Sequence, residues 1–367
     1  MITKSYELEL ITPCFCGGAE PEQQAEIRAP SIRGQLRWWF RTLGGFKSLA
    51  LQGMGVRQQE DLIFGTVAGN GGRAGQLLVR VNALSPSREV VDDESMNARP
   101  GTERGYLLFP LRAEKKGKPE ERRRDRGVFN KNAQAGSAAP CFRLQLCWRG
   151  DPALATDLDA LAAVFGHLGA LGFRSRRAMG ALAFRSGSPN LNAALRRFQS
   201  RNSVVVRQLS ANSPSDAILA LARWLKSWRS HGRSGKNNDE QKTPGFQYAK
   251  HDHDLASKKH PGPAYRPALG LPMLTAYGNW SLEKPDKPGG TKGRFASPVL
   301  LRPHKDPQGK WHALIIFVDA HKWPDGKPVY LNGQQRQIAM VTLADGTRSP
   351  ALYEAMKNDN RLSEFLG

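Results

Sequence analysis

The chain has 367 residues, of which 40% are hydrophobic, and its 54 Lys and Arg against 33 Asp and Glu give a formal net charge of +21. This composition excludes a disordered basic tail and predicts a folded protein that binds a polyanion. No apolar run approaches the roughly 18 residues of a membrane span, and MITKSYELEL does not read as a signal segment. We therefore expect a cytoplasmic protein with no membrane partner.

The four cysteines, Cys14, Cys16, Cys141 and Cys147, form no CxxC pair, so a disulfide scaffold is not expected. Small buried hydrophobic residues are the favoured interpretation, and a four-thiolate zinc site is the alternative. We expect no cofactor and no metal.

Apolar periodicity predicts most of the regular elements. The expected strands cover residues 4–11, 75–84, 105–112, 141–148, 204–209, 294–301 and 311–319. The expected helices cover residues 32–43, 151–171, 191–200, 216–228 and 349–366.

The order in the first half is strand, helix, strands, helix, strand, which is that of the ferredoxin-like fold, also used by RNA-recognition domains. The second half is compatible with another such unit. The segment SGSPN at residues 186–190 suggests a boundary. We therefore predict an α+β protein with two tandem ferredoxin-like (RRM-like) domains, residues 1–187 and 188–367, the second with a basic loop near residues 229–265.

Residues 26–45, EIRAPSIRGQLRWWFRTLGG, carry the most informative helical pattern. Ser31 follows Pro30 and precedes an amphipathic run, so we expect Ser31 to cap the helix. The apolar residues that share one face are Ile32, Leu36, Trp39, Phe40 and Leu43. This face should pack against the core.

A stripe of arginines lies beside that apolar face. Arg33, Arg37 and Arg41 recur every four residues, and like charges at this spacing cost an isolated helix roughly a few tenths of a kcal/mol each. Gly34 costs about 1 kcal/mol of helix propensity against Ala and permits the close approach of another backbone. With the amides of the helix N-terminus, these residues predict an anion-binding surface. A solvated basic face is the alternative.

A second segment combines glycines and arginines. This segment is Gly166 followed by HLGALGFRSRRAMGALAF, residues 167–184. Its arginines, Arg174, Arg176 and Arg177, are surrounded by Gly166, Gly169, Gly172 and Gly180. Free amides in a glycine-rich turn, together with guanidinium groups, predict a phosphate cradle.

Three other clusters have more than one interpretation. Asp92, Asp93 and Glu94 suit a metal or a general base, or a solvated turn. Residues 113–139 are rich in both charges and predict a projecting loop. The run from His251 to Asp254 alternates His and Asp. On an extended segment both histidines would face one side and could perform acid-base chemistry. The alternative is a surface loop without a catalytic role.

The runs TPCFCGG, EIRAPSIRGQLRWWFR, GALGFRSRRAMGAL and RFASPVLL closely resemble the RAMP superfamily of CRISPR proteins, specifically the subunit-one family of the type III-B Cmr effector complex. The resemblance implies a non-catalytic RNA-binding subunit in antiviral defence. It also implies a place at one end of a ribonucleoprotein, in contact with guide RNA or its complementary target RNA and beside other Cmr subunits.

Trp38 lies off the apolar stripe and could stack on a base. With it, the expected RNA-binding residues are Arg28, Ser31, Arg33, Gly34, Arg37, Trp38, Arg41, Gly172, Arg174, Arg176 and Arg177. Seven arginines on phosphates would give a log-log salt slope of roughly −5 on single-stranded RNA. The sequence departs from the family at residues 177–180, RAMG, where such loops usually read Arg-Gly-aromatic-Gly.

Two other functions remain open. A CRISPR-processing, metal-independent endoribonuclease would use His251 or His253 on a ribose 2′-hydroxyl. A ribosomal or tRNA-associated binding protein would fit the charge, although not the pairing of the two motifs.

Overall fold

The computed structural model describes residues 1–18, 25–67, 71–83, 89–90, 102–108, 127–128, 140–230, 242–258, 260–275, 277–287, 289–319 and 323–365. Its residues form two compact units. Unit 1 contains residues 1–221, 301–316 and 364–367, and unit 2 contains residues 222–300 and 317–363. The domain boundary after residue 187 stays a prediction. None of the described helices is long and apolar enough to cross a membrane.

The first sheet of unit 1 contains four antiparallel strands in the order β4-β7-β1-β8. They are β1 (Ile2–Leu10), β4 (Leu77–Ala83), β7 (Cys141–Trp148) and β8 (Leu182–Phe184). Strand β1 pairs with β7 along nearly its whole length, from Ile2 opposite Trp148 to Glu9 opposite Cys141. The strands predicted at residues 4–11, 75–84 and 141–148 are therefore confirmed.

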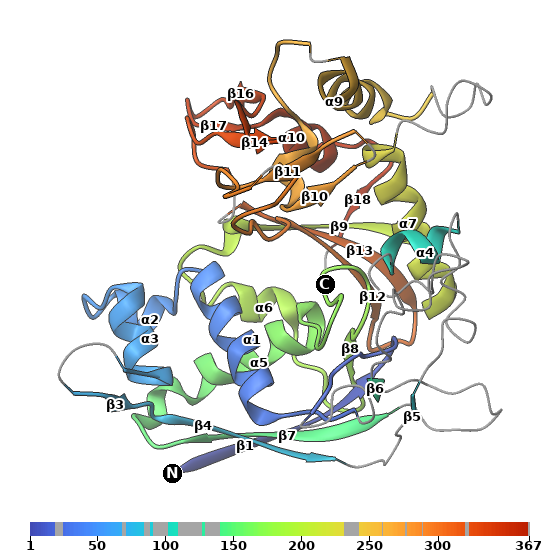
Figure 1. Ribbon diagram of the computed structural model, residues 1–367. Helices are drawn as coiled ribbons and strands as arrows, with labels where there is room; N and C mark the ends of the chain where they lie inside the picture. The colour runs from blue at the N-terminus through green and yellow to red at the C-terminus, as the bar shows by residue number, and fades with distance from the viewer. Residues whose placement is uncertain are drawn as a thin grey trace. The chain divides into compact units, whose positions relative to one another are not determined.

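Helices α1 (Ala29–Thr42) and α5 (Ala155–Leu168) lie on one side of this sheet, as Figure 1 shows. Helix α5 is apolar and covered on nearly all sides. Of its eleven residues from Leu158 to Leu168, only Asp159 is not buried. A helix that is hydrophobic all round belongs in a core. The sheet and the buried helix α5 thus support α1.

The second four-stranded sheet has the order β12-β13-β9-β18, and most of its residues belong to unit 1. Its strands are β9 (Val204–Ser210), β12 (Val299–Lys305), β13 (Trp311–Val318) and β18 (Ser363–Glu364). Arg302 of β12 is buried and its Nη2 donates to the carbonyls of Gly166 at 2.8 Å and Leu182 at 2.6 Å. Burial lowers the pKa of Arg302 to about 9. This side chain ties the second sheet to the first within unit 1.

Unit 1 also contains short elements at its surface. They are α2 (Lys47–Ala50), α3 (Val56–Phe64), β2 (Gly65–Thr66), β3 (Arg73–Ala74), β5 (Glu89–Val90), α4 (Glu103–Leu107), β6 (Gly127–Val128) and α6 (Leu191–Leu195). Helix α7 (Pro214–Arg229) begins in unit 1 and its residues from Ala222 onward belong to unit 2.

Unit 2 is built around a small sheet with the order β10-β11-β14-β15. Its remaining elements are α9 (Phe246–Lys258), β10 (Met273–Leu274), β11 (Asn279–Ser281), β14 (Val329–Leu331), β15 (Gln334–Arg336), β16 (Met340–Thr342), β17 (Arg348–Pro350) and α10 (Ala351–Lys357). Trp280, Trp323 and Val329 lie at the centre of its apolar core.

Three expected elements are wrong or shifted. The apolar run predicted as a strand at residues 105–112 begins instead with α4, because Thr102 Oγ1 accepts a hydrogen bond from the Gly105 amide at 3.0 Å and caps a helix. The strand predicted at residues 294–301 begins only at Val299. The C-terminal helix ends at Lys357, well before the predicted end at residue 366.

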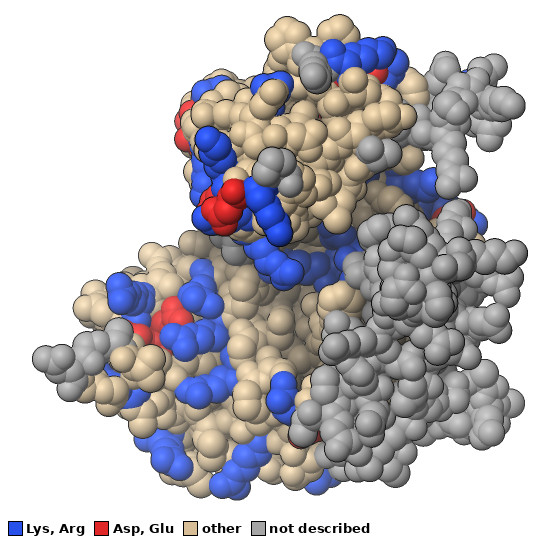
Figure 2. Space-filling model, viewed as in Figure 1, with Lys and Arg blue, Asp and Glu red and all other residues tan. Residues whose placement is uncertain are grey.

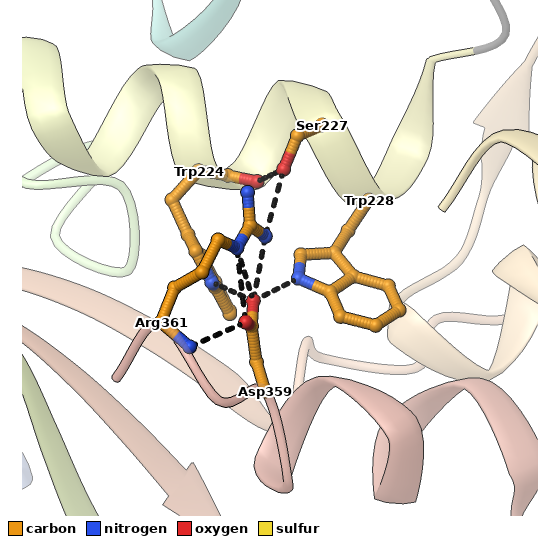
Figure 3. A network of polar contacts seen from close by, with 5 residues as sticks. All are labelled: Trp224, Ser227, Trp228, Asp359 and Arg361. Carbon is orange, nitrogen blue, oxygen red and sulfur yellow. Dashed lines mark hydrogen bonds and ion pairs between the residues drawn. The ribbon is translucent and has the colours of Figure 1, made fainter. Parts of the chain in front are cut away.

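A buried carboxylate fastens the chain after α10 to α7 (Figure 3). Asp359 Oδ2 accepts hydrogen bonds from Trp224 Nε1 at 2.9 Å and Trp228 Nε1 at 2.8 Å. Arg361 donates its backbone amide and Nε to Asp359 Oδ1 at 3.0 and 2.9 Å, and its Nη2 reaches Ser227 Oγ at 3.1 Å. Burial alone would raise the pKa of Asp359, but the hydrogen bonds from Arg361 and the two indoles lower it to about 2.

We expect Asp359→Asn to lower the free energy of unfolding by about 2 kcal/mol, because buried donors lose a charged acceptor. The folded-state pKa lies below the ordinary value of 3.8, so the contribution is present above pH 4 and is lost as the pH falls towards 2. Urea unfolding at several pH values measures this difference. The control is Asp325→Asn, which breaks an exposed pair with Arg348 and should cost less than about 1 kcal/mol. Equal losses in the two variants would contradict the role of Asp359.

Candidate nucleic-acid interface

Helix α1 begins earlier than predicted. Arg28 is its N-cap residue, and the Arg28 carbonyl accepts hydrogen bonds from the amides of Ser31 at 3.0 Å and Ile32 at 3.2 Å. Ser31 is therefore an exposed residue of the first turn, and the prediction that it caps the helix is wrong. Pro30 is accommodated because the first-turn amides have no intrahelical acceptor.

The apolar face of α1 is confirmed. The residues with at most 1% exposure on this face are Ile32, Leu36, Trp39, Phe40 and Leu43. Phe40 contacts Phe46 and Phe64 edge to face, with ring centroids 5.1 and 5.7 Å apart. The orientation of α1 is thus fixed by packing, and Thr42 is buried as well.

The arginine stripe has a partner that the sequence did not indicate. Arg37 Nε forms an ion pair with Glu60 Oε1 of α3, and Arg41 Nε lies 3.8 Å from the same oxygen. Arg33 Nη2 donates to the carbonyl of Phe64 at the end of α3. The stripe is therefore partly compensated, because Glu60 cancels one of the three positive charges.

The stripe nevertheless presents positive charge to solvent. The side chains of Arg37 and Arg41 are 38% and 54% exposed, whereas Glu60 is 9% exposed. Figure 2 shows basic side chains around acidic ones in the region where Figure 1 places α1 and α3. An incoming anion would meet guanidinium groups before it met the carboxylate.

The outward face of α1 consists of Ser31, Gly34, Trp38 and Arg41, spaced at three, four and three residues. A Cβ atom at Gly34 would meet no atom within 4 Å. No contact with the described residues therefore requires glycine here, although glycine costs about 1 kcal/mol of helix propensity against Ala. Gly34 leaves a depression between larger neighbours on this face.

The second motif lies against this face. The Arg176 guanidinium carbon is 4.9 Å from the centroid of the Trp38 ring, a cation–π contact within unit 1. Trp38 in turn contacts Trp39 edge to face, with centroids 4.8 Å apart. Burial lowers the pKa of Arg176 from its ordinary value. The two arginine-containing segments thus meet at Arg176 and Trp38.

Two of the other predicted arginines brace the loop. Arg174 has a left-handed backbone with φ of 63°, and its Nε donates to the carbonyl of Leu107 at 2.7 Å, at the end of α4. Arg177 is 9% exposed, and its Nη1 donates to the carbonyl of Arg176 at 3.0 Å. These positions set the loop backbone, and Arg176 has the side chain that reaches α1.

The loop amides do not form the predicted phosphate cradle. Phe173 N donates to the Phe15 carbonyl at 2.8 Å, Ala178 N to Leu301 at 2.9 Å and Gly180 N to Pro13 at 2.8 Å. The glycines serve close packing instead. Gly172 has φ of 79°, and a Cβ there would lie 2.6 Å from the Phe15 carbonyl oxygen.

The two histidines of the run from His251 to Asp254 do not share one side of an extended segment, because the run lies in α9. His251 Nε2 donates to the carbonyl of Pro263 at 3.0 Å. The His253 ring contacts Tyr277 edge to face, with centroids 4.7 Å apart. The predicted pairing of two histidines for acid-base chemistry is therefore wrong.

The aspartates of the same run also have partners within unit 2. Asp252 is fully buried and accepts hydrogen bonds from the Arg266 amide at 2.7 Å and the Arg266 Nε at 3.2 Å. Burial raises the pKa of Asp252 despite these contacts. Asp254 pairs with Lys250 at 2.8 Å and Lys258 at 3.3 Å. Asp252 thus joins α9 to the segment at Arg266, whereas the ion pairs of Asp254 lie within α9.

The cysteines do not gather into a four-thiolate zinc site. Cys14, Cys141 and Cys147 are buried, as expected of small hydrophobic residues. Among the described residues, no group of three or more His, Cys, Asp and Glu is placed to hold a metal ion. The acidic cluster at residues 92–94 lies outside the described residues, as does the charged run at residues 113–139 apart from residues 127–128.

The residues missed by sequence reasoning lie in α3. None of the expected strands or helices covers residues 46–74, yet the Gly55 amide donates to Gln58 Oε1 at 2.9 Å at the start of this helix. The available signal was an apolar pair, Ile63 and Phe64, that follows Glu60 at helical spacing. It indicated a helix without indicating that Glu60 would reach α1.

The bracing role of Arg174 predicts a difference in stability between two arginines. Arg174→Ala should lower the free energy of unfolding by about 2 kcal/mol, because a charged donor to a backbone carbonyl is lost. Arg41→Ala, at an exposed position, should cost less than about 0.5 kcal/mol. Urea unfolding of both variants measures this, and an equally small loss for Arg174→Ala would contradict the assignment.

Comparisons with known proteins agree with these motifs. The profile of the RAMP superfamily matches residues 7–183. CRISPR system Cmr subunit Cmr1-1 of Pyrococcus furiosus is 26% identical over 182 residues, which cover 50% of this chain and 47% of that protein. Cmr subunit Cmr1-2 of the same organism is 37% identical over 62 residues, which cover 17% of this chain and 32% of that protein. The matches thus span about half and about a third of these curated relatives.

The crystal structure of Cmr1 from Pyrococcus furiosus in its apo form matches with a TM-score of 0.52 and 14% identity, and the match covers 97% of this chain and 96% of that chain. At this identity the likeness concerns the fold alone. The RAMP superfamily profile thus matches residues 7–183, and the chain is similar in sequence to Cmr subunit Cmr1-1 and in fold to Cmr1 of Pyrococcus furiosus.

Proposed function

We propose that this chain is a non-catalytic RNA-binding subunit of a type III-B Cmr ribonucleoprotein effector complex in the cytoplasm. It would contact guide RNA, its complementary target RNA or both at one end of the complex, beside other Cmr subunits, in antiviral defence. The observation that carries the proposal is the contact of Arg176 with Trp38, since it joins the two motifs into one surface.

The proposed architecture is a tandem of ferredoxin-like domains. Two observations support it. The first sheet has the order β4-β7-β1-β8 with α1 after its first strand and α5 after its third. The second has the order β12-β13-β9-β18 with α7 after its first strand and α10 after its third. Each set follows the chain order β-α-β-β-α-β of the ferredoxin-like motif. We retain residues 1–187 and 188–367 as the proposed domains.

The RNA strand would run along the outward face of α1. Phosphates would pair with arginine side chains that are exposed, Arg28 and Arg41, or half-buried, Arg37 and Arg176. Ser31 could donate its hydroxyl to a phosphate or ribose, and Gly34 would admit the sugar-phosphate backbone close to the helix. Arg33, Arg174, Arg177 and Gly172 would act indirectly by holding α1 and the loop in place.

Trp38 would contribute to base stacking together with Arg176. A guanidinium held on an indole presents a flat, charged plate whose position is already fixed, and bases stack on both aromatic rings and guanidinium planes. Fixing the plate before binding reduces the side-chain entropy lost on RNA binding. Contacts to phosphate and to base faces are largely sequence-blind, which suits a subunit that must accept many guide sequences.

The contacts of α9 favour this function over the endoribonuclease alternative. The His251 Nε2 proton is donated to a carbonyl, and His253 and His251 have separate neighbours. A general acid and base pair must reach one ribose and one leaving oxygen. The separate placement of the histidines supports a subunit that binds RNA without cleaving it.

The test is the salt dependence of RNA binding, followed by fluorescence anisotropy with a labelled single-stranded RNA. Each neutralised phosphate contributes about 0.7 to the log-log slope, so four seated phosphates give a slope of about −3 rather than the −5 expected from seven. Arg37→Ala with Arg41→Ala should lower affinity and reduce the slope by about 1.4.

The matched control removes two positive charges elsewhere, with Lys310→Ala and Arg348→Ala, both at exposed positions. This variant should bind RNA like the wild type. A flat salt response of the wild type, or equal losses in the two double variants, would contradict the proposed function.

A further inference from the structure

Two cysteines lie side by side directly after β1. Cys14 Sγ and Cys16 Sγ are 3.2 Å apart, and both thiols are free. The Cys16 amide donates to the Cys14 carbonyl at 3.2 Å, and this tight turn brings both side chains to one side. Cys14 is fully buried, whereas Cys16 is half-buried and so reachable from solvent.

The two cysteines flank the residue that supports the arginine-containing loop. Phe15 pairs with Phe173, whose amide donates to the Phe15 carbonyl at 2.8 Å. On one side, Cys14 Sγ lies 3.5 Å from the Leu171 carbonyl oxygen. On the other, the Cys16 carbonyl accepts from the Glu26 amide at 2.7 Å, just before α1. A change at the thiols therefore acts on the loop and on the approach to α1.

We propose that Cys14 and Cys16 form a reactive dithiol, a modification site that closes to an intramolecular disulfide with a small disulfide such as oxidised glutathione. The Cys16 thiolate attacks one sulfur of the reagent, forming a mixed disulfide and releasing one glutathione thiolate. Cys14 then loses its proton to solvent, and its sulfur attacks Cys16 Sγ and releases the second glutathione. The protein gives up two electrons, and one glutathione disulfide becomes two thiols.

The surroundings assign the two roles. Cys16 attacks because a reagent can reach it, and Cys14 resolves the mixed disulfide because it is buried beside Cys16. The hydrogen bond with Cys16 and burial raise the pKa of Cys14, so Cys14 does not act first. Cys141 and Cys147 stand six residues apart on β7, about 20 Å along a strand, and cannot bridge.

Closure would also alter the loop. The sulfurs must approach from 3.2 Å to about 2.05 Å, and Phe15 lies between them in the chain. The Phe15 carbonyl accepts a hydrogen bond from the Phe173 amide at 2.8 Å, three residues before Arg176, so a shift of Phe15 acts directly on the loop that carries Arg176. We therefore expect the disulfide to weaken RNA binding, an effect that rests on the proposed function.

The full-length protein is incubated with oxidised glutathione, alkylated with iodoacetamide and digested with trypsin. The peptide from Ser5 to Arg28 contains both thiols. In the wild type it should lose about 2 Da and take up no label. In Cys14→Ser the same peptide should retain glutathione on Cys16, because no resolving thiol remains. A control, Cys147→Ser, should behave like the wild type. Full double alkylation of the wild-type peptide would overturn the dithiol site.

RNA affinity is then measured on the oxidised and the reduced protein from one preparation. We expect the oxidised form to bind at least about threefold more weakly and reduction to restore binding. Equal affinities would overturn the effect on the loop. Failure of the reduced protein to bind RNA would count against the proposed function alone, since disulfide formation is read from the peptide mass.

Discussion

The Arg176 guanidinium rests on the Trp38 indole, and through this contact two segments about 140 residues apart in sequence make one surface. Each of these two residues is held in place by the element that carries it. Trp38 is carried by a helix whose apolar face is buried, and Arg176 by a loop fixed at Phe15, Leu107 and Leu301. A cation–π contact contributes about 0.5–2 kcal/mol and could not order these segments alone. It sets the final geometry of parts that the core has already placed.

Positive charge in this region serves two separate purposes. Arg174 and Arg177 spend their hydrogen bonds on carbonyls of the same chain, which stabilises a backbone that no periodic structure supports. Arg37 and Arg41 share Glu60 and remain partly exposed. A carboxylate beneath two guanidinium groups limits their mutual repulsion in the free protein, while their outer edges stay available to an anion. Under the proposed function, these guanidinium groups would already be in place when RNA binds.

The sequence predicted best those features that depend on a single helix or strand. The alternation of residues 4–11 and 141–148 and the apolar face of α1 predicted their burial, because period and side-chain type suffice for that. Contacts between elements could not be predicted in the same way. Nothing in the arginine stripe indicated Glu60, the glycines of the loop suggested free amides that are in fact bonded, and the alternating His and Asp hid a helix in which Asp252 faces the core.

Gly34 provides the most direct test, because its cost to α1 is offset by no contact with the part of the chain that the structure describes. Gly34→Gln and Gly34→Ala should both raise the free energy of unfolding by roughly 0.5–1 kcal/mol, since both residues favour a helix and meet open space. If an RNA strand lies against this face, Gly34→Gln should weaken RNA binding at least about tenfold, while the smaller methyl of Gly34→Ala should weaken it far less. Wild-type affinity in the stable Gly34→Gln protein would contradict the account.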